Sequence, residues 1–441
     1  MSSPIKNQRN ILNKLSIEKL NPMQEEALLA IHSHKDIVLL SPTGTGKTLA
    51  FLLPLISELC MDCDEVQALI IVPSRELAIQ IEQVIRNMGT GYKTNAIYGG
   101  RSGYKDKIDL KHRPAILIGT PGRIADHLRR KTFPADKITT LVLDEFDKSL
   151  EIGFEEEMKT ICDLLPDIKK RILTSASNEV EIPTFVGLKN PFIINYLDDG
   201  VPQLKIKTII SPSKDKLVTL LETIVKIGNQ PGIIFCNFKD TIQWVSNFLT
   251  ENNIEHGCFY GDMEQKDRER TLIKFRNGTY QLIIATDLAS RGLDIPELKF
   301  IIHYQLPNRG HEFIHRNGRT ARMNSKGTAF VLKWINEELP DFIKDSEHDD
   351  DNDDVTLNNS EPNQKIWKTL YISGGRNDKI SKGDIAGLFM KQGKLNKDEI
   401  GTIEIKQECA FVAIDASKVN RLINILDNTK LKNKKIKVSI I

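Results

Sequence analysis

The chain has 441 residues, of which 40% are hydrophobic and 27% charged, and its formal net charge is +2. This length and composition are those of a soluble globular protein of about two to four domains. No run approaches the ~20 apolar residues of a membrane span, and residues 1–20 lack the uninterrupted apolar core of a secretory signal.

The cysteines argue for a reducing environment. Six are scattered along the chain, and only Cys60 and Cys63 have CxxC spacing. Because no second CxxC or His pair lies nearby, this spacing argues against a zinc or redox site. We therefore expect a cytoplasmic location.

The charge is distributed unevenly. Residues 363–441 carry 16 Lys/Arg and 8 Asp/Glu, a net of +8, so the rest of the chain is net acidic at −6. A basic tail either meets nucleic acid or forms a solvated basic face, and charge alone does not separate these two interpretations.

The first half of the chain predicts alternating strands and helices. Residues 1–24 are a polar, helix-prone lead-in, and Pro22 is well placed to begin a helix over 23–32. Short apolar runs between amphipathic helical patterns predict a parallel sheet buried on both faces. The predicted strands are 37–40, 69–72, 94–98, 115–118, 141–143, 172–173 and 192–195.

A Gly-rich loop follows the first of these strands. Residues 41–48 read Ser-Pro-Thr-Gly-Thr-Gly-Lys-Thr and run into a helical pattern over 49–59. The two glycines leave backbone N–H groups open to an anion at the positive end of that helix. Lys47 can reach the β- and γ-phosphates of a nucleotide, and the Thr48 hydroxyl can ligate Mg²⁺. Ser41 stands where the strict pattern has Gly, and the alternative interpretation is a turn merely rich in Gly and Thr.

Carboxylates follow the strand at 141–143. The stretch 141–147 reads Leu-Val-Leu-Asp-Glu-Phe-Asp. In a parallel sheet the end of this strand faces the phosphate loop, so Asp144 can hold Mg²⁺ while Glu145 orients or deprotonates a water. Acids after a strand are also common as plain loop residues, and the phosphate loop about 100 residues upstream is what favours the catalytic interpretation.

A second alternating series begins after a predicted hinge at 198–202. Its predicted strands are 232–235, 257–259, 282–285, 300–304 and 328–332, and it has no phosphate loop of its own. Residues 315–322 place three arginines within seven residues. Arg319 and Arg322, three apart, are predicted to share a helical face and to reach the γ-phosphate as arginine fingers. The alternative is a surface basic patch.

The last part of the chain changes pattern. Residues 345–354 hold seven acids in ten residues, which predicts a disordered linker. Beyond it the predicted order is strand, helix, strand, strand, helix, strand, which is the layout of an RNA-recognition motif. These elements are expected at 366–372, 382–391, 400–405, 410–414, 417–426 and 435–441.

At this point the chain resembles a DEAD-box RNA helicase, a superfamily 2 ATPase, over roughly residues 15–340. The phosphate loop and the Asp-Glu-Phe-Asp stretch match motifs I and II of that family, and the other motifs follow in the family's order. They are similar to motif Ia at 73–80, the GG element at 99–100, motif Ib at 120–123, motif III at 175–177, motif IV at 233–237, the QxxR element at 265–268, motif V at 285–294 and motif VI at 315–322. Residues 363–441 resemble, less specifically, the RNA-binding domain of DbpA-type helicases.

The resemblance implies roles for individual residues. Gln24 would read the adenine edge, and the residues around the phosphate loop would bind ATP with Mg²⁺ held through Thr48 and Asp144. The implied ATP-binding residues are Gln24, Ser41, Thr43, Gly44, Thr45, Gly46, Lys47, Thr48, Asp287 and Asp294. Residues implied to couple the two domains are Asp147, Ser175, Ser177, His315 and Arg316. The implied RNA path is lined by Ser74, Arg75, Gly99, Gly100, Thr120, Arg123, Asn237, Arg268 and Thr286.

The sequence departs from the family pattern at three places. Phe146 replaces the usual Ala in motif II, and its ring needs space. Motif III ends in Ser177 where the family usually has Thr. The family places an aromatic about 17 residues before the adenine-reading Gln, but that position is Asn7, and residues 1–24 contain no aromatic. Adenine is then held by Gln24 and apolar packing alone.

The C-terminal tail is expected to bind RNA through Tyr371 and Phe411. In an ordinary RNA-recognition motif, aromatics on the two central strands stack bases. Tyr371 and Phe411 occupy two of those positions, but Cys409 takes the third. Either single-strand reading is weak or the domain binds folded RNA through another face. The alternative is that both aromatics belong to the core.

These patterns and the resemblance together predict an α/β fold of two RecA-like parallel-sheet domains in tandem, plus a small α+β, RRM-like C-terminal domain. The expected boundaries are 1–197, 203–344, a linker at 345–362, and 363–441. The expected function is ATP-dependent unwinding of RNA duplexes by a monomer. The further expectation that the RNA is ribosomal, and that the protein acts in large-subunit (23S rRNA) assembly, rests only on the DbpA-like tail.

Three other functions remain open. One is an ATP-gated RNA clamp or scaffold that closes and stays on its RNA. Another is a general RNA chaperone in mRNA turnover or cold adaptation. The third is a DNA helicase, which the family's use of the 2′-OH disfavours.

Overall fold

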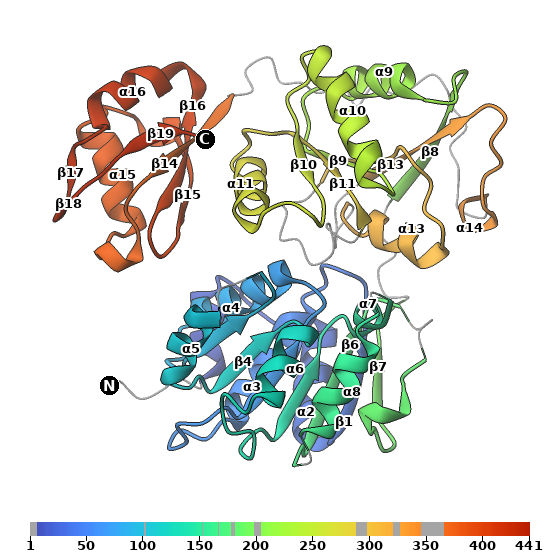
Figure 1. Cartoon of the computed structure of the whole chain (residues 1–441), viewed down its shortest axis with the longest axis vertical. Coiled ribbons are helices and arrows are strands. Elements are labelled where there is room, and N and C mark those ends of the chain that lie inside the picture. Colours follow the sequence, from blue (N-terminus) through green and yellow to red (C-terminus); the bar gives the residue numbers. More distant parts are fainter. Residues whose placement is uncertain are drawn as a thin grey trace. The chain divides into compact units, whose positions relative to one another are not determined.

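The computed structural model describes residues 7–100, 103–151, 153–165, 167–177, 181–197, 204–287, 298–320, 327–344 and 366–441. The chain divides into two compact units, essentially residues 1–202 and 203–441 (Figure 1). The predicted hinge at 198–202 and the acidic stretch at 345–354 lie outside the described residues. No helix in the described ranges is long and apolar enough to cross a membrane.

The first unit is built on a seven-stranded sheet in which every pair is parallel, in the order β3-β4-β2-β5-β6-β1-β7. Alternate residues of β1 enter the cores on opposite faces, because Ile37 and Leu39 join one cluster and Val38 and Leu40 the other. This double burial is why the strands were recognisable as continuous apolar runs. The strands are β1 (Asp36–Leu40), β2 (Ala68–Ile71), β3 (Thr94–Ile97), β4 (Ile116–Gly119), β5 (Thr140–Leu143), β6 (Lys170–Ser175) and β7 (Phe192–Asn195).

Helices of the first unit pack on both faces of this sheet. The helix predicted over 23–32 begins at Pro22, and Asn21 caps it in a capping box with Gln24. The helix after the phosphate loop begins at Lys47, and Gly46 lies in the left-handed region before it. The helices are α1 (Gln8–Lys14), α2 (Pro22–Ser33), α3 (Lys47–Glu58), α4 (Arg75–Met88), α5 (Gly103–Lys111), α6 (Pro121–Arg129), α7 (Phe146–Glu151) and α8 (Glu155–Asp163).

The second unit contains a six-stranded parallel sheet in the order β10-β11-β9-β12-β13-β8. The strand β8 (Leu204–Ser211) was missed by the sequence analysis. It is a half-exposed edge strand that pairs only with β13 among the described strands, and its alternating lysines hide it from a search for apolar runs. The others are β9 (Gly232–Phe235), β10 (Gly257–Phe259), β11 (Leu282–Ala285), β12 (Phe300–His303) and β13 (Gly327–Trp334).

The helices of this sheet are α9 (Leu217–Ile227), α10 (Lys239–Glu251), α11 (Gln265–Arg276), α13 (Gly310–Asn317) and α14 (Asp341–Lys344). The prediction that Arg319 and Arg322 share a helical face is wrong for Arg319. The helix α13 ends at Asn317, and Arg319 lies in the turn that follows. Gly318 follows the last helical residue, a position where chains commonly leave a helix. Arg322 lies outside the described residues.

The C-terminal domain has the predicted strand and helix order around an antiparallel sheet, β15-β16-β14-β19. Leu370 and Ile372 enter its core, so Thr369 and Tyr371 lie on the opposite face of the sheet. Its main elements are β14 (Trp367–Ile372), α15 (Lys382–Lys391), β15 (Ile400–Ile405), β16 (Ala410–Asp415), α16 (Val419–Leu426) and β19 (Val438–Ile440).

The last strand predicted at 435–441 is present as β19, but it is shorter than predicted. It is preceded by a hairpin of two short strands, β17 (Lys430–Leu431) and β18 (Lys434–Lys435). The hairpin turns at Lys432, whose φ of +52° lies in the left-handed region. Lysines and an asparagine carry the turn, so hydrophobic periodicity held no signal for it.

A buried histidine ties together the sheet and α13 of the second unit. His303 is fully buried at the end of β12, with Nε2 at 3.0 Å from Oδ1 of Asn317. The rings of Phe235 and Phe313 pack beside it, with centroids 6.2 and 4.9 Å away. Burial, reinforced by the neighbouring Arg316 guanidinium, lowers the pKa of His303 to about 3.

We predict that His303 makes the protein lose stability in mild acid. In the unfolded chain the imidazole has an ordinary pKa near 6.5, so between about pH 6.5 and 3 the unfolded state binds the extra proton. The free energy of unfolding therefore falls as the pH is lowered through this window. Urea unfolding of the parent and of His303→Gln at pH 7, 6 and 5 tests this. The variant should show a shallower decline, and equal slopes would contradict the prediction.

Candidate functional site

In the first unit, most of the residues implied to bind nucleotide and RNA lie at the carboxyl edge of the sheet, and Gln24 on α2 contacts the phosphate loop at that edge. Loops after β1, β5 and β6 carry the nucleotide set, and loops after β2, β3 and β4 carry the RNA set. In the order β3-β4-β2-β5-β6-β1-β7 these two groups of strands are contiguous halves of the sheet. Because all strands run parallel, one edge of the sheet presents both groups side by side.

The phosphate loop has the geometry of an anion cradle. Gly44 and Gly46 have φ of +85° and +89°, which other residues rarely adopt. Lys47, 8% exposed, donates to the carbonyl oxygens of Ser41 and Pro42 at 2.5 and 2.8 Å. Burial lowers the pKa of Lys47 to about 8, against the opposing effect of the Glu145 and Asp144 carboxylates. The ammonium is thus held by weak carbonyl partners, which a phosphate can replace.

Ser41, the departure from the strict loop pattern, has a structural role. Its hydroxyl donates to Oγ1 of Thr45 at 2.7 Å, and Thr45 in turn donates to the Pro42 carbonyl at 2.9 Å. Ser41 is 1% exposed. The two hydroxyls close the loop from inside, a contact that glycine could not make.

Gln24 contacts the phosphate loop directly. Its Nε2 donates to the Gly46 carbonyl at 3.2 Å, and its Oε1 accepts from the Asn21 backbone N–H at 3.1 Å. Asn21 also contacts the phosphate loop, because its Nδ2 donates a hydrogen bond to the Thr45 carbonyl at 2.9 Å. The amide of Gln24 keeps a second N–H and a second lone pair, so it can still read a base. Asn7, at the position of the missing aromatic, caps α1.

The acidic turn after β5 faces a threonine that the sequence analysis missed. Thr174 on β6 donates its hydroxyl to Oδ1 of Asp144 and accepts the Glu145 backbone N–H at 3.1 Å. Glu145 has φ of +51°, a strained value for a non-glycine residue. Burial raises the pKa of Asp144 to about 6, and the neighbouring Glu145 carboxylate adds to the effect. A threonine inside a strand carries no sequence signal for this role.

Lys148 was also missed. It is fully buried, and its Nζ lies 3.2 Å from Oε2 of Glu145. This cation therefore orients the carboxylate implied to activate water. The ring of Phe146 is 3% exposed and joins the core cluster beneath the turn, which answers the question of space raised by this substitution.

Three of the residues implied to couple the domains, Asp147, Ser175 and Ser177, lie together in the first unit, whereas His315 and Arg316 belong to the second. The hydroxyl of Ser177 donates to Oδ2 of Asp147 at 3.4 Å, so Ser serves where the family usually has Thr. Ser175 also forms a hydrogen bond with Asp147. Its hydroxyl donates to the Ser177 carbonyl at 2.6 Å. Burial raises the pKa of Asp147, while these partners oppose the shift. The carbonyl of Ser175 accepts the Ser41 N–H at 3.1 Å, which joins this group to the phosphate loop.

On the RNA half of the edge, the two glycines of the GG element make room for an arginine. A Cβ on Gly100 would lie 2.6 Å from Nη1 of Arg75, and one on Gly99 would lie 3.7 Å from Nη2. Ser74 caps the helix that begins at Arg75, accepting the Leu77 N–H at 3.2 Å. The Arg75 guanidinium therefore packs directly against the backbone of Gly99 and Gly100, where a side chain would displace it.

Arg123 is held by a buried carboxylate that the sequence analysis did not identify. Its Nε and Nη2 lie 2.8 and 2.6 Å from Oδ2 of Asp106, which is fully buried. Nε2 of His127 lies 3.2 Å from the same oxygen. Thr120 stands at the start of the same helix and is 8% exposed. Asp106 sits in a helix with no recognisable motif, so only the fold brings it to Arg123.

In the second unit, Arg316 is the centre of a network. It is 1% exposed and forms a bidentate pair with Asp287 at 2.7 and 2.5 Å. It also donates to Oδ1 of Asn237 and to the Gln305 carbonyl, both at 2.7 Å. The structure therefore brings together residues assigned to three different roles. Arg316 holds this edge of the domain together.

The remaining implied residues of the second unit lie at the same edge or just beyond it. Arg268 is 7% exposed, stacks 4.7 Å from the centroid of Phe259, and donates to the Gly261 carbonyl at 3.4 Å. Thr286 directly follows β11. His315 and Arg319 are buried. Asp294 lies outside the described residues, as does Arg322.

The site fits a magnesium ion that completes its shell with phosphate and water. Within the described ranges, no group of three or more His, Cys, Asp or Glu side chains could hold a metal by itself. Mg²⁺ commonly takes one or two protein ligands and fills the rest with substrate oxygens and water. Asp144, whose buried carboxyl has a raised pKa, lacks full compensation for its charge, and a divalent cation would supply it.

Comparisons with known proteins agree with this geometry. Residues 21–183 match the DEAD/DEAH box helicase family, 215–324 the helicase conserved C-terminal domain, and 369–440 the DbpA RNA binding domain. The chain is 31% identical to the ATP-dependent RNA helicase DbpA of Bacillus subtilis, covering 97% of this chain and 96% of that one. It is also 31% identical to DbpA of Escherichia coli, over 98% and 96%. The structure of S. cerevisiae Dbp5 bound to RNA and ADP BeF3 is similar, with a TM-score of 0.68, 26% identity, and coverage of 77% and 92%.

We predict that Gln24 sets the preference for adenine. Gln24→Ala should narrow the ratio of ATP to GTP affinity by about tenfold or more, because no aromatic stacks on the base in compensation. Asn21→Ala is the matched control, since it removes the same helix cap and a similar tie to the loop. Equilibrium binding of fluorescent ATP and GTP analogues measures both. If the two variants change the ratio equally, Gln24 acts only through the loop.

Proposed function

We propose that this chain, which belongs to the DEAD-box family of ATP-dependent RNA helicases, unwinds short RNA duplexes during assembly of the large ribosomal subunit. It is an ATP-hydrolysing enzyme with an RNA-binding C-terminal domain. The observation that carries the enzymatic part is the convergence of Lys47 with Asp144 and Glu145 at one sheet edge. The ribosomal target rests on the resemblance of the C-terminal domain to DbpA-type helicases, and two DbpA relatives match the chain over nearly its full length.

In this proposal the nucleotide binds across the phosphate loop. The backbone N–H groups of residues 41–48 and the Lys47 ammonium hold the phosphates, and Gln24 reads the base. Thr48 and Asp144 would hold Mg²⁺, which supplies charge neutralisation on the phosphate oxygens. Thr174 donates its hydroxyl to the Asp144 carboxylate and thereby fixes its orientation.

Glu145 is proposed to orient and deprotonate the attacking water. Its carboxylate is positioned by the ion pair with Lys148 at 3.2 Å and by the backbone turn at Thr174. Arg319 and Arg322 are proposed to neutralise charge on the transferring phosphoryl group once the two domains close. Asp287 and Asp294 would approach the nucleotide from the second domain in that closed state.

RNA is proposed to follow the other half of the edge. Ser74, Arg75, the glycines at 99–100, Thr120 and Arg123 would contact its phosphates and 2′-hydroxyls from the first domain. Asn237, Arg268 and Thr286 would continue that path on the second. Closure around ATP bends one strand of the duplex, and the group formed by Asp147, Ser175, Ser177, His315 and Arg316 links that movement to hydrolysis.

The proposed domain boundaries are 1–197 and 203–344 for the helicase domains, 345–362 for the linker, and 363–441 for the C-terminal domain. We propose that the enzyme acts as a monomer in the cytoplasm. Free thiols at all six cysteines support a reducing compartment. The implied ATP and RNA residues all come from this one chain, which is consistent with activity as a monomer.

The C-terminal domain is proposed to direct the enzyme to its RNA. Tyr371 and Phe411 pack edge to face on the open face of the sheet, with ring centroids 5.8 Å apart and ring planes at 62°. Phe411 is 6% exposed, so it supports Tyr371 more than it offers a stacking surface. Cys409 is half-buried there, and burial raises the pKa of its thiol. RNA recognition therefore depends on more than an ordinary stacking platform.

We predict that phosphate binding and hydrolysis can be separated genetically. Lys47→Ala should abolish ATP binding, whereas Glu145→Gln should retain binding and lose turnover by a factor of about 10² or more. Lys148→Gln is the control for loss of the ion pair, and it should keep more activity than Glu145→Gln. Nucleotide binding and RNA-stimulated ATPase rates measure the difference. ATP hydrolysis by Glu145→Gln at the parent rate would disprove the assignment of Glu145.

We predict that a 1–345 truncation keeps ATPase activity on generic RNA but loses preference for one ribosomal RNA fragment. The tail has a net charge of +8 and should also add salt-dependent affinity for any RNA. The RNA concentration at half-maximal ATPase rate is compared for both lengths, on a ribosomal fragment library and on unrelated RNA of equal length. If truncation weakens every RNA equally, the tail is a nonspecific anchor and the ribosomal part of the proposal fails.

A further inference from the structure

The open face of the C-terminal sheet contacts the second helicase domain. Arg276, the last residue of α11, donates from Nε and Nη2 to the two carboxylate oxygens of Glu404 on β15, at 2.7 and 3.0 Å. Bidentate pairs of this kind fix orientation as well as distance. The charges are each about one-fifth to one-quarter exposed, so solvent screens the pair only in part.

A second, neutral contact lies at the centre of the same face. Thr369 on β14 is fully buried, and its Oγ1 lies 2.8 Å from Oγ1 of Thr279. Asn277 donates from Nδ2 to the same hydroxyl at 3.2 Å. Both partners belong to the turn after α11 and are themselves buried. The Thr369 hydroxyl is fully buried and takes part in two hydrogen bonds, so the two surfaces are packed together at this point.

The register of the sheet places Tyr371 beside this contact. Residues 369 and 371 lie on the same face of β14, because Leu370 between them enters the core. Tyr371 therefore points toward the second helicase domain. It is half-buried and packs edge to face against Phe411, which restricts the ring without covering it completely.

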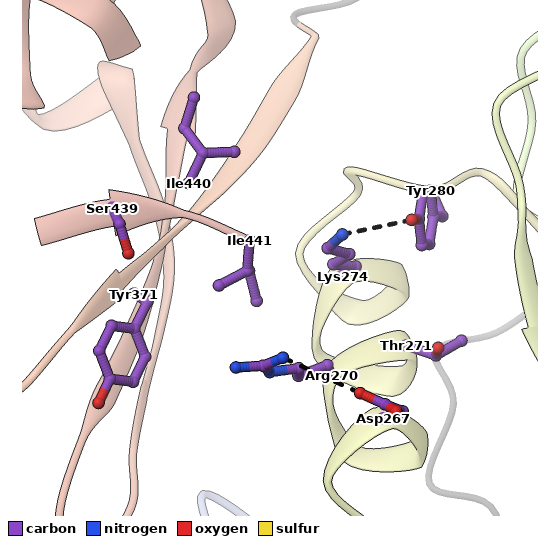
Figure 2. A pocket seen from close by; sticks show the side chains of 9 residues that line it. All are labelled: Asp267, Arg270, Thr271, Lys274, Tyr280, Tyr371, Ser439, Ile440 and Ile441. Atoms are coloured by element: carbon purple, nitrogen blue, oxygen red, sulfur yellow. Dashed lines mark hydrogen bonds and ion pairs between the residues drawn. The ribbon is translucent and has the colours of Figure 1, made fainter. Parts of the chain in front are cut away.

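A cleft of about 520 Å³ opens between α11 and the edge of this sheet. Figure 2 shows Arg270 and Lys274 on the α11 side, and Tyr371 and Ile441 on the side of the C-terminal domain. Tyr280 completes the wall near Lys274, whose Nζ lies 3.3 Å from the phenol oxygen and 5.0 Å from the ring centroid. This volume is within the usual range for sites that hold one small organic ligand.

The walls of the cleft combine cations with aromatic rings. Nη1 of Arg270 is 3.9 Å from its acidic neighbour Asp267, at the outer limit of an ion pair, and its side chain is 39% exposed. Lys274 contacts the phenol of Tyr280, and within the described part of the chain it forms no ion pair with a carboxylate. Cations that remain available for an anion, next to a ring that remains available for stacking, are the two components of single-stranded nucleic-acid binding.

We propose that this cleft is a binding site for one or two nucleotides of single-stranded RNA. A base stacks on Tyr371 while Arg270 and Lys274 contact the flanking phosphates. An acidic peptide would use the same cations but gain little from the aromatic ring, so the composition of the cleft favours RNA. The proposal rests on the proposed function only in taking RNA as the ligand.

The helix α11 makes this site a continuation of the RNA path. Arg268, implied to contact RNA in the helicase core, lies on the same helix as Arg270 and Lys274. A helix of 12 residues is a rigid element, so RNA held in the cleft is also held at a set distance from Arg268. The ion pair of Glu404 with Arg276 and the hydrogen bonds of Thr369 hold the C-terminal wall of the cleft in place.

The test uses the full-length chain and a fluorescein-labelled 20-nucleotide oligouridine, which carries no ribosomal sequence. Affinity is measured between 50 and 200 mM salt for the parent and for Arg270→Gln/Lys274→Gln. Loss of two phosphate contacts should flatten the slope of log K against log salt by about 1.4. The matched control is Lys214→Gln/Lys226→Gln, which neutralises two exposed lysines in and just before α9, and it should leave the slope nearly unchanged.

Tyr371→Leu tests the stacking contact. It should weaken oligouridine binding by about 5- to 150-fold with little change in the salt slope, since no charge is lost. Combined with Arg270→Gln/Lys274→Gln, its effect should be smaller than on the parent, because the groups act on the same nucleotides. Crosslinking of 4-thiouridine to the peptide containing Tyr371 should occur in the parent. Thermal unfolding midpoints confirm that each variant is folded.

Three results would overturn the proposal. They are salt slopes that match the control variant, a Tyr371→Leu affinity equal to that of the parent, and competition by polyglutamate as effective as that by unlabelled oligouridine. Since the probe is not ribosomal, none of these bears on the preference for ribosomal RNA. Loss of that preference alone would leave the cleft intact as an RNA site.

Discussion

The nucleotide site depends on charge kept out of water at the carboxyl edge of the first sheet. Lys47, Asp144 and Lys148 are each at most 8% exposed, so they lose hydration and must compensate one another. Burial lowers the pKa of Lys47 and raises that of Asp144, because each charged form loses hydration. In the function proposed above, the phosphates and Mg²⁺ of a nucleotide would supply charges that these buried groups lack.

The second helicase domain meets the same constraint in a different way. Arg316 is almost fully buried, but Asp287, Asn237 and the Gln305 carbonyl satisfy its guanidinium within the domain. These hydrogen bonds are all made within the domain, so they fix the position of the Arg316 side chain.

The C-terminal domain uses its open sheet face to contact the helicase core. Thr369 and Glu404 lie on that face and are engaged by the end of α11 and the turn after it. An RNA-recognition motif would ordinarily offer this whole face to single-stranded RNA. Here part of the face contacts the helicase core, and Tyr371 lines a cleft together with Arg270 and Lys274 of α11. These contacts join the C-terminal sheet to the helix that also carries Arg268.

The sequence by itself determined the two parallel sheets and the third domain, and it located the phosphate loop after the first strand. Strands buried on both faces leave continuous apolar runs, and a phosphate loop needs glycines and a lysine at fixed spacing, so both are local signals. Edge strand β8 and the end of α13 before Arg319 were not visible, because exposure and helix termination depend on neighbours. Thr174, Lys148 and Asp106 were decided only by tertiary structure. Each lies far from its motif or carries no motif, and it acts because the fold buries it against a charged partner.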